Sequence, residues 1–358
     1  MSQLHAAGNV RPYWVHDEED TCAESADVAL YLRRAFLPLR REGDTLLVAL
    51  ADRSAENCYW IRARYGPVCF LGVALTELHA EITQRFEGKL SSEAIFSLAR
   101  ERPELSAQRI LTPTQGEGLL AAAVLSALWL VWDPLPALAA VVIAMTVLFI
   151  VGTLFRVLLS WFGGLPPERE QGHAGCDDTS LPAYSILIPL YREAKVVPGL
   201  LQALARLEYP RGKLDIKLVV EGDDAETTAA CEQHLPAGAF EIVSVPPSLP
   251  RTKPKALNYA LRSARGEYLV VYDAEDRPEP DQLLKSIALF RRLPRSVACL
   301  QARLAFHNRD RWLSKSFAID YFTWFGSLLP GLEKLRVPMP LGGTSNHFRT
   351  AVLNEIGA

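Results

Sequence analysis

The chain has 358 residues, of which 49% are hydrophobic and 22% are charged. This composition excludes a mainly disordered chain, and the length predicts two or three domains. The net charge of −3 excludes the overall basic surface typical of nucleic-acid-binding proteins, so we expect no nucleic-acid partner. The six cysteines form no CxxC pair and no zinc spacing with histidine, which indicates thiols in a reducing compartment.

Residues 1–112 predict a small α+β domain. The apolar alternation at 45–51 is typical of a strand, and the segments 81–88 and 93–105 have the pattern of short helices. This part of the sequence contains no combination of residues typical of catalysis. We interpret His79, which has no spaced partner in the sequence, as a structural or surface residue.

Two apolar runs in the middle of the chain predict a pair of membrane-spanning helices. The runs 118–132 and 134–155 carry no charged residue, and the second is as long as the ~20 residues that a spanning helix needs. The Asp133-Pro134 pair between them is typical of a helix break. Neither run has a polar face, which favours a transmembrane hairpin over the alternative, a buried hairpin in a soluble core.

The bounds and orientation of this hairpin follow from its flanks. We expect helices at about 114–132 and 135–158 within a hairpin at 113–162, followed by a linker at 163–182. The connecting loop carries only one acidic residue, whereas both outer flanks carry arginine. The positive-inside rule then places both termini in the cytoplasm of a multi-pass membrane protein.

Residues 183–358 have the pattern of an α/β domain. Near-continuous apolar runs alternate with amphipathic helical segments, which predicts a parallel, Rossmann-like sheet covered on both faces. Ligands of such sheets bind outside the carboxyl ends of the strands. The expected strands are 184–190, 216–220, 240–245, 267–273 and 297–304.

Acidic residues follow three of these expected strands, at one edge of the sheet. Crowded carboxylates repel one another, and a divalent cation with a diphosphate would compensate their charge. Oxygen ligands favour Mg²⁺ or Mn²⁺. Each acidic loop taken alone is also typical of a helix N-cap or a turn. The residues are Glu193, then Glu221, Asp223 and Asp224, then Asp273, Glu275 and Asp276.

The order of these motifs resembles glycosyltransferase family 2. The segments IPLYREA, EGDD, KPKALNYAL and VVYDAEDRPEPD carry the resemblance, and the group most similar to them is that of the membrane-embedded, processive β-glycan synthases, such as cellulose synthase. GGTSNHFR at 342–349 resembles the acceptor-side loop of that group. The resemblance implies a GT-A glycosyltransferase domain over 183–358, in a bacterial inner (plasma) membrane protein.

The resemblance also implies roles for individual residues. Lys255 would approach the diphosphate. Asp273 and Glu275 match the two acids of the family's Asp-x-Asp motif, of which the second binds the metal, and Asp276 lies beside Glu275 as an alternative ligand. The expected metal ligands are Asp273, Glu275 and Asp276. The expected substrate-binding residues are Glu193, Glu221, Asp223, Asp224, Lys255, Asp273, Gly343, Thr344 and Ser345.

The implied reaction transfers a hexosyl unit, with inversion, from an NDP-sugar to a growing β-linked polysaccharide. The donor most common in the family is a UDP-sugar. The implied partners are the sugar nucleotide, a glycan acceptor, membrane lipid and export proteins. The family's Thr-Glu-Asp-like base motif and its Gln-x-x-Arg-Trp motif do not occur in the sequence, so we expect a C-terminally truncated synthase whose catalytic base lies beyond Ala358. The alternatives are a non-processive transferase to a lipid or short acceptor, and a non-catalytic membrane scaffold or receptor subunit.

A second resemblance concerns the N-terminal region. FLPLRREGDTLLVALAD, followed by a helix ending in EITQRFEG, resembles part of the N-terminal domain of type II secretion and pilus assembly ATPases. Some relatives of that domain bind cyclic di-GMP, but their nucleotide-contacting repeat is not recognisable in this sequence. We therefore carry over the fold alone and do not expect cyclic di-GMP as a partner.

Overall fold

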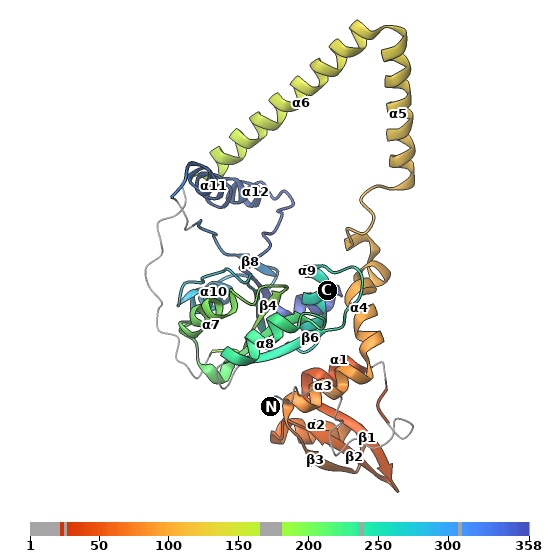
Figure 1. The fold of residues 1–358 in the computed structure, drawn as a ribbon, viewed down its shortest axis with the longest axis vertical. Helices are drawn as coiled ribbons and strands as arrows, with labels where there is room; N and C mark the ends of the chain where they lie inside the picture. Colours follow the sequence, from red (N-terminus) through yellow and green to blue (C-terminus); the bar gives the residue numbers. More distant parts are fainter. Residues whose placement is uncertain (1–21, 25–26, 165–180, 236–239, 307–309, 358) are drawn as a thin grey trace, which may run out of the picture. The chain divides into compact units, whose positions relative to one another are not determined.

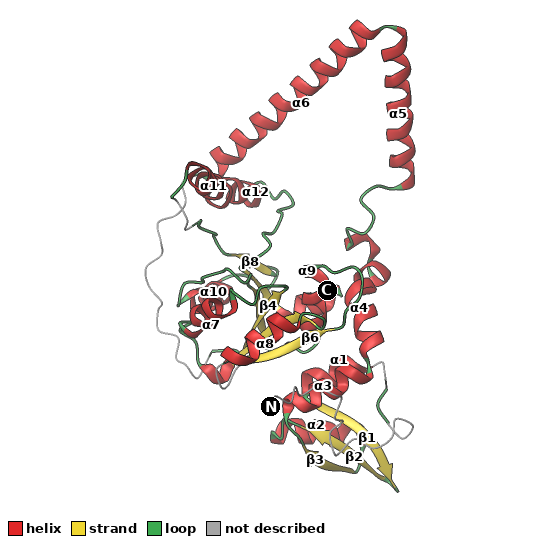
Figure 2. Cartoon of the chain, viewed as in Figure 1, coloured by secondary structure: helices red, strands yellow, loops and turns green. Residues whose placement is uncertain are grey.

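The computed structural model describes residues 22–24, 27–164, 181–235, 240–306 and 310–357. The chain forms two compact units (Figures 1 and 2). The first unit combines residues 1–101, 176–299 and 347–358, and the second combines 102–175 and 300–346. Most of the expected linker at 163–182 lies outside the described residues, and so does Ala358, beyond which the catalytic base is expected.

The N-terminal part of the first unit is a small α+β layer. Its sheet has the order β1-β2-β3, with β1 and β2 antiparallel and β2 and β3 parallel. Strand β2 confirms the strand expected at 45–51. The elements are α1 (Val28–Arg34), β1 (Phe36–Glu42), β2 (Thr45–Leu50), α2 (Ala55–Tyr65), β3 (Val68–Gly72), α3 (Leu75–Arg85) and α4 (Glu87–Glu101), followed by a 3₁₀ turn at Pro103–Leu105 in the second unit.

A six-stranded sheet of order β6-β5-β4-β7-β9-β8 forms the larger part of the α/β fold. Strands β6, β5, β4 and β7 are parallel neighbours, as expected from their apolar sequences. The strands are β4 (Tyr184–Leu190), β5 (Leu214–Glu221), β6 (Phe240–Val245), β7 (Tyr268–Val271), β8 (Cys299–Gln301) and β9 (Asn346–Arg349). Strand β9 was not expected, because its residues belong to the segment interpreted as an acceptor loop.

Helices connect and cover these strands. Helix α9 packs against β4, β5 and β6, and α8 packs against β5. The helices are α7 (Val197–Ala205), α8 (Ala225–His234), α9 (Lys253–Leu261), α10 (Gln282–Arg292) and α13 (Thr350–Ile356), with a 3₁₀ turn at Arg211–Lys213.

A buried row of polar side chains crosses three strands of this sheet. Ser185 Oγ donates to Asp215 Oδ2 at 2.7 Å, and Lys217 Nζ lies 3.0 Å from Asp215 Oδ1. Lys217 Nζ also lies 2.5 Å from Glu241 Oε2, and the second Glu241 oxygen lies 2.6 Å from His79 Nδ1 on α3. His79, which has no spaced partner in the sequence, therefore joins the N-terminal layer to the sheet.

This row predicts a loss of stability in acid. Burial raises the pKa of Glu241, but the His79 hydrogen bond and the Lys217 charge outweigh it and lower the pKa from 4.5 to about 2. The carboxylate therefore stabilises the fold above pH 4.5, and this contribution of about 3 kcal/mol is lost as the pH falls from 4.5 to 2. Urea unfolding at pH 5 and pH 3 is expected to show about 2 kcal/mol of this loss. Glu241→Gln is expected to flatten the pH dependence, and an equally steep dependence in this variant would contradict the assignment.

The second unit contains two long apolar helices, α5 (Pro113–Trp132) and α6 (Pro134–Gly163). Both are long and apolar enough to cross a membrane, and their most apolar windows have no residue buried by the rest of the structure. A capping box starts α5: Thr112 Oγ1 accepts from Gln115 N at 3.3 Å, and Gln115 Oε1 accepts from Thr112 N at 3.0 Å. The break between the helices falls at Asp133, as expected.

A helical segment of three parts consists of α11 (Trp312–Thr323), a π-helical turn (Trp324–Leu328) and α12 (Leu329–Lys334). The end of α6 packs against the π-helical turn and α12. Leu159, Leu329 and Leu332 form the buried centre of this contact. Two glycines allow the backbones to approach. A Cβ at Gly331 would lie 2.2 Å from Leu159 O, and one at Gly163 would lie 1.9 Å from Ser327 O.

Gly331→Ala is therefore expected to separate α12 from α6. The added methyl group would meet backbone atoms only, which cannot rotate away, so we expect a cost of about 1–3 kcal/mol, typical of overpacking. Protease susceptibility of α11 and α12 in detergent measures the change. Gly152→Ala is the control, because Gly152 lies on α6, the partner helix, and no atom is within 4 Å of its new Cβ. Equal susceptibility of the two variants would contradict the close contact.

Candidate functional site

The candidate site lies where the strand order of the sheet reverses. The chain runs from β4 to β5 on one side and later places β7 on the other side of β4. The loops after β4 and β7 therefore diverge at this switch point, where doubly wound sheets bind their ligands. The structure brings both loops, with the start of α9, to this edge of the first unit.

The loop after β7 presents two carboxylates from a tight turn. Asp276 Oδ2 accepts from Asp273 N at 2.8 Å, and Asp276 N donates to Asp273 O at 3.1 Å. The Asp273 carboxylate forms an ion pair with Lys253 at the start of α9, while Glu275 is exposed. Asp276, expected as a metal ligand, thus has a carboxylate oxygen on the backbone of the turn, and it shapes the loop that carries Asp273 and Glu275.

The loop after β4 brings a third carboxylate. Burial raises the pKa of Glu193, and the negative charges of Glu275 and Asp273 raise it further. Glu193 N donates to Thr227 Oγ1 at 3.0 Å, which fixes the loop. The residue before it, Arg192, has a φ of 58°. A left-handed arginine is a strained conformation that neighbouring structure must hold, and such conformations cluster at functional sites.

Asp224 holds that conformation. Its Oδ2 accepts from Arg192 N at 2.5 Å, and its Oδ1 accepts from Thr227 N at 3.2 Å as the N-cap of α8. Burial raises its pKa, but these hydrogen bonds outweigh burial and lower it. Asp224, expected to contact the substrate, therefore connects the loops after β4 and β5. Its neighbour Asp223 is exposed and binds Arg251 at 2.6 Å, and Arg251 donates to Tyr191 Oη at 3.3 Å.

Lys255 and Glu221 form a buried ion pair. Lys255 is 2% exposed and Glu221 is 6% exposed, and their charged atoms lie 3.0 Å apart. Lys255 also donates to Ser248 O at 3.0 Å. The lysine expected to approach a diphosphate is thus enclosed by acceptors. Lys253, which the sequence analysis did not select, is the partly exposed lysine of the motif; its place one residue after the N-cap of α9 was the available signal.

The side chains present are suitable for a divalent cation. In the described parts of the chain, no three His, Cys, Asp or Glu side chains are grouped closely enough to hold a metal. Asp273 and Glu275 are nevertheless hard oxygen donors on one loop, and their charges act on Glu193. Mg²⁺ and Mn²⁺ in phosphate sites commonly take one or two carboxylates, with the remaining ligands from phosphate and water. Asp273 and Glu275 fit that pattern.

Comparison with known proteins identifies the domain. Residues 182–358 match the model of "Glycosyltransferase like family 2". The chain carries a family 2 glycosyltransferase domain. This match and the observed parallel sheet support the expected GT-A-like α/β fold.

Relatives of the domain are named as glycosyltransferases. Glucomannan 4-beta-mannosyltransferase 2 of Arabidopsis thaliana is 26% identical over 56% of this chain and 40% of its own length. Beta-monoglucosyldiacylglycerol synthase of Trichormus variabilis is 28% identical over 50% of this chain and 38% of its own length. The chain thus spans less than half of these relatives. Among solved structures, the mannosyltransferase PcManGT of Pyrobaculum calidifontis, in complex with GDP-Man and Mn²⁺, is 23% identical, with a TM-score of 0.46 over 61% of this chain and 58% of that one.

The expected acceptor loop of the family 2 domain is held by Gln301 within the second unit. Gln301 Oε1 accepts from Gly342 N at 2.7 Å, and Gln301 Nε2 donates to Thr344 O at 3.2 Å. Ser345 has a φ of 53°, and its carbonyl accepts from Ala302 N at 2.9 Å. Thr344 and Ser345 are buried, while Gly343 is exposed. These hydrogen bonds connect the backbone of the loop to β8 and to the residue that follows it.

Proposed function

We propose that this chain transfers a hexosyl unit from a nucleotide sugar to a growing β-linked polysaccharide at a membrane. The observation that carries the proposal is the gathering of Glu193, Asp273 and Glu275, with Lys253, at the switch point of a family 2 glycosyltransferase domain. The charges of Glu275 and Asp273 raise the pKa of Glu193, and such crowding of carboxylates favours a bound cation. A lysine beside them favours an anionic ligand such as a diphosphate.

In the proposed reaction, an acceptor hydroxyl oxygen bonds to the anomeric carbon of the donor from the face opposite the diphosphate. The bond between that carbon and the diphosphate oxygen breaks, the nucleoside diphosphate leaves with the electron pair, and the hydroxyl proton passes to a carboxylate base. A divalent cation, when bound, neutralises the charge that grows on the leaving diphosphate. Asp273 and Glu275 would hold the cation, and Lys253 would place a further positive charge beside the leaving group. We assign the base to none of the described residues, and its expected place beyond Ala358 stays a prediction.

The nucleoside would lie over the loops after β4 and β5. Tyr191 is an exposed aromatic side chain at the end of β4, and its hydroxyl accepts from Arg251. Arg251 in turn binds the exposed Asp223. An aromatic face beside paired hydrogen-bonding groups suits a nucleobase and ribose, because the face stacks and the polar groups orient. We propose UDP as the carrier, with GDP as the alternative.

The membrane location is supported by the second unit. Trp132 ends α5 and Trp161 lies near the end of α6, and these rings are 91% and 83% exposed. Tryptophan near the ends of apolar helices is typical of the membrane interfaces. Thr146 and Thr153 donate to carbonyl oxygens one turn earlier, at 2.8 Å, so their hydroxyls need no water. We propose that α5 and α6 form a transmembrane hairpin.

Helix α11 supports the same placement. It carries the exposed apolar residues Trp312, Leu313, Phe317, Ile319 and Phe322, and it continues into the segment that packs on the Trp161 end of α6. An aromatic-rich helix at the end of a spanning helix suits the lipid headgroup level. We propose that both termini face the cytoplasm of a bacterial inner membrane, with lipid and export proteins as partners.

One observation favours a second candidate function. The relative named beta-monoglucosyldiacylglycerol synthase indicates a glycolipid product, for which a lipid acceptor would approach along the membrane interface. The donor site described above would serve either acceptor. The two candidates differ in the product and not in the use of the nucleotide sugar.

A product assay separates these functions. The protein, extended beyond Ala358 by the segment expected to carry the base, is reconstituted in proteoliposomes with diacylglycerol and incubated with Mn²⁺ and radiolabelled UDP-glucose, UDP-N-acetylglucosamine or GDP-mannose. Label in high-molecular-weight glycan that a β-glycanase degrades is the expected result. Label extracted into organic solvent would instead support the lipid acceptor. Metal-dependent nucleotide binding without any transfer would favour the non-catalytic scaffold.

A further inference from the structure

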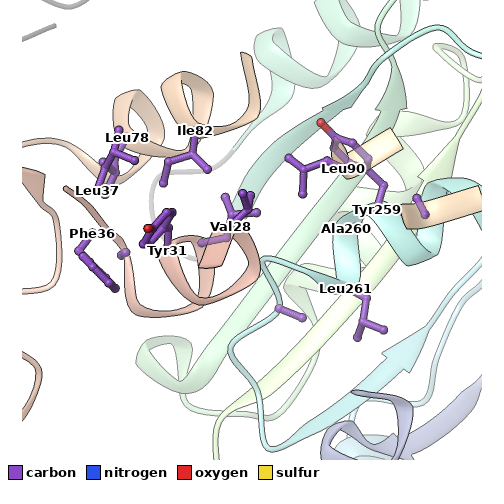
Figure 3. Close-up of a cluster of buried hydrophobic side chains, with 14 of the residues drawn as sticks. Val28, Tyr31, Phe36, Leu37, Leu78, Ile82, Leu90, Tyr259, Ala260 and Leu261 are labelled. Atoms are coloured by element: carbon purple, nitrogen blue, oxygen red, sulfur yellow. The ribbon is translucent and has the colours of Figure 1, made fainter. Parts of the chain in front are cut away.

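The N-terminal layer is packed against the helix that carries the two lysines of the donor site. Leu90 and Ala94 of α4 belong to the same buried apolar cluster as Tyr259, Ala260 and Leu261 of α9. Figure 3 shows Leu90 next to Tyr259 in this cluster. The chain thus has one continuous core from its N-terminal strands to the family 2 sheet.

Polar contacts fix the position of α9 within this packing. Asn258 Nδ2 donates to the Ala94 carbonyl oxygen at 3.1 Å, and Arg262 lies 4.0 Å from Glu93. Ala94 O is a helical carbonyl, so the extra bond requires α4 and α9 to keep one register. A second attachment, His79 to Glu241, joins the layer to the neighbouring strand β6 at 2.6 Å. Two separate attachments prevent rotation of the layer.

The orientation of α9 determines where its two lysines lie, because the helix is short and its first turn is part of the site. Tyr259, which packs on Leu90, follows Lys255 by four residues and therefore lies on the same face, one turn along. Lys255 holds Glu221 at the end of β5, and Lys253 holds Asp273 at the end of β7. A tilt or rotation of α9 would move both ammonium groups relative to the carboxylates.

We infer that the N-terminal layer positions the donor site: α4, through Leu90, Ala94 and the Asn258 bond, sets the orientation of α9 and thereby of Lys253 and Lys255. These α4 and α9 residues are positioning residues, since none of them lies at the switch point. The inference rests on the proposed function for its nucleotide readout.

The test uses the full chain in detergent. Ala94→Leu overpacks the α4–α9 contact, and Asn258→Ala removes its hydrogen bond. We expect each variant to weaken Mn²⁺-dependent UDP binding at least threefold, to raise amide hydrogen exchange in α9, and to raise the rate at which an amine-acylating reagent labels Lys253. The control Phe96→Ala, on the exposed side of α4, is expected to change none of these.

The readouts decide between the possible outcomes. If both variants keep the wild-type circular dichroism spectrum, UDP affinity, α9 exchange and Lys253 labelling, the inference is wrong. If Ala94→Leu does not fold, Asn258→Ala alone decides, because it removes only a side-chain amide. If the wild-type chain binds no nucleotide, the proposed function fails, while faster Lys253 labelling in the variants still supports the positioning of α9.

Discussion

Asp273→Asn is expected to weaken Mn²⁺-dependent binding of a nucleoside diphosphate by at least about tenfold and to lower sugar transfer by about a hundredfold or more. The substitution removes a negative oxygen donor from the turn after β7 and leaves Lys253 without its ionic partner. The turn itself is kept, because its hydrogen bonds use the backbone of Asp273 and the side chain of Asp276. Isothermal titration with UDP measures the affinity, and the product assay measures transfer.

A nearby exposed carboxylate provides the matched control. Glu279 lies in the same segment after β7 and pairs with Lys285 on the surface, 2.6 Å apart. Glu279→Gln removes the same unit of charge and is expected to leave affinity and transfer unchanged. Equal losses in the Asp273 and Glu279 variants would mean that general surface charge, and not the turn, attracts the nucleotide. That result would remove Asp273 from the site.

Lys255→Met is expected to destabilise the domain by about 3–5 kcal/mol, because it leaves Glu221 buried without a cation. The methionine keeps most of the volume and the apolar stem, so the loss comes from the charge and its hydrogen bonds. Urea unfolding, monitored by far-UV circular dichroism at pH 7, measures the difference. The same experiment on the wild type sets the reference.

Two further variants identify the cause of that loss. The double variant Lys255→Met with Glu221→Gln removes both charges and is expected to recover most of the stability. Lys285→Met breaks an exposed pair and is expected to cost less than about 1 kcal/mol. A Lys255→Met cost as small as that of Lys285→Met would contradict a buried pair. Lys255 would then be available to a ligand, as its sequence motif alone implies.

The arrangement of the sheet was predictable because its signal is local. Strands buried on both faces must be apolar along their whole length, and the runs at 184–190 and 240–245 coincide with β4 and β6. The helix break at Asp133 was predictable for a similar reason, since proline two residues later than Trp132 ends any helical hydrogen-bond pattern. Strand β9 was missed because its four residues, Asn346–Arg349, are mostly polar and carry no such apolar signal.

The sheet edge where the candidate site lies was predictable, but the pairings of its side chains were not. Acidic residues after parallel strands must meet at one edge, and the charges of Asp273 and Glu275 raise the pKa of Glu193. Whether a given carboxylate has a structural hydrogen bond or ion pair depends on partners far along the chain. The Asp224 carboxylate accepts a hydrogen bond from Arg192 N, 32 residues away, and Lys255 forms an ion pair with Glu221, 34 residues away. Sequence spacing within a motif contains no information about such partners.

The packing of the N-terminal layer on α9 was not predictable either. The apolar faces of α4 and α9 each have several possible partners, and only the folded chain shows that they bury one another. The layer was therefore interpreted as a separate small domain at 1–112. The boundary at 112 remains a prediction, while the shared core shows that residues up to Glu101 pack with the sheet as one unit.

The central claim is that the switch point between β4 and β7 is a metal-dependent nucleotide-sugar site. Isothermal titration of the purified full chain with UDP and GDP, first in Mn²⁺ and then in EDTA, tests it most directly. The account predicts binding of at least one of the two in Mn²⁺, weakened at least about tenfold by EDTA, and not reproduced by uridine or guanosine, since the diphosphate contacts carry the metal dependence. Equal affinity in Mn²⁺ and EDTA, or binding of the nucleoside as tight as that of the diphosphate, would contradict it.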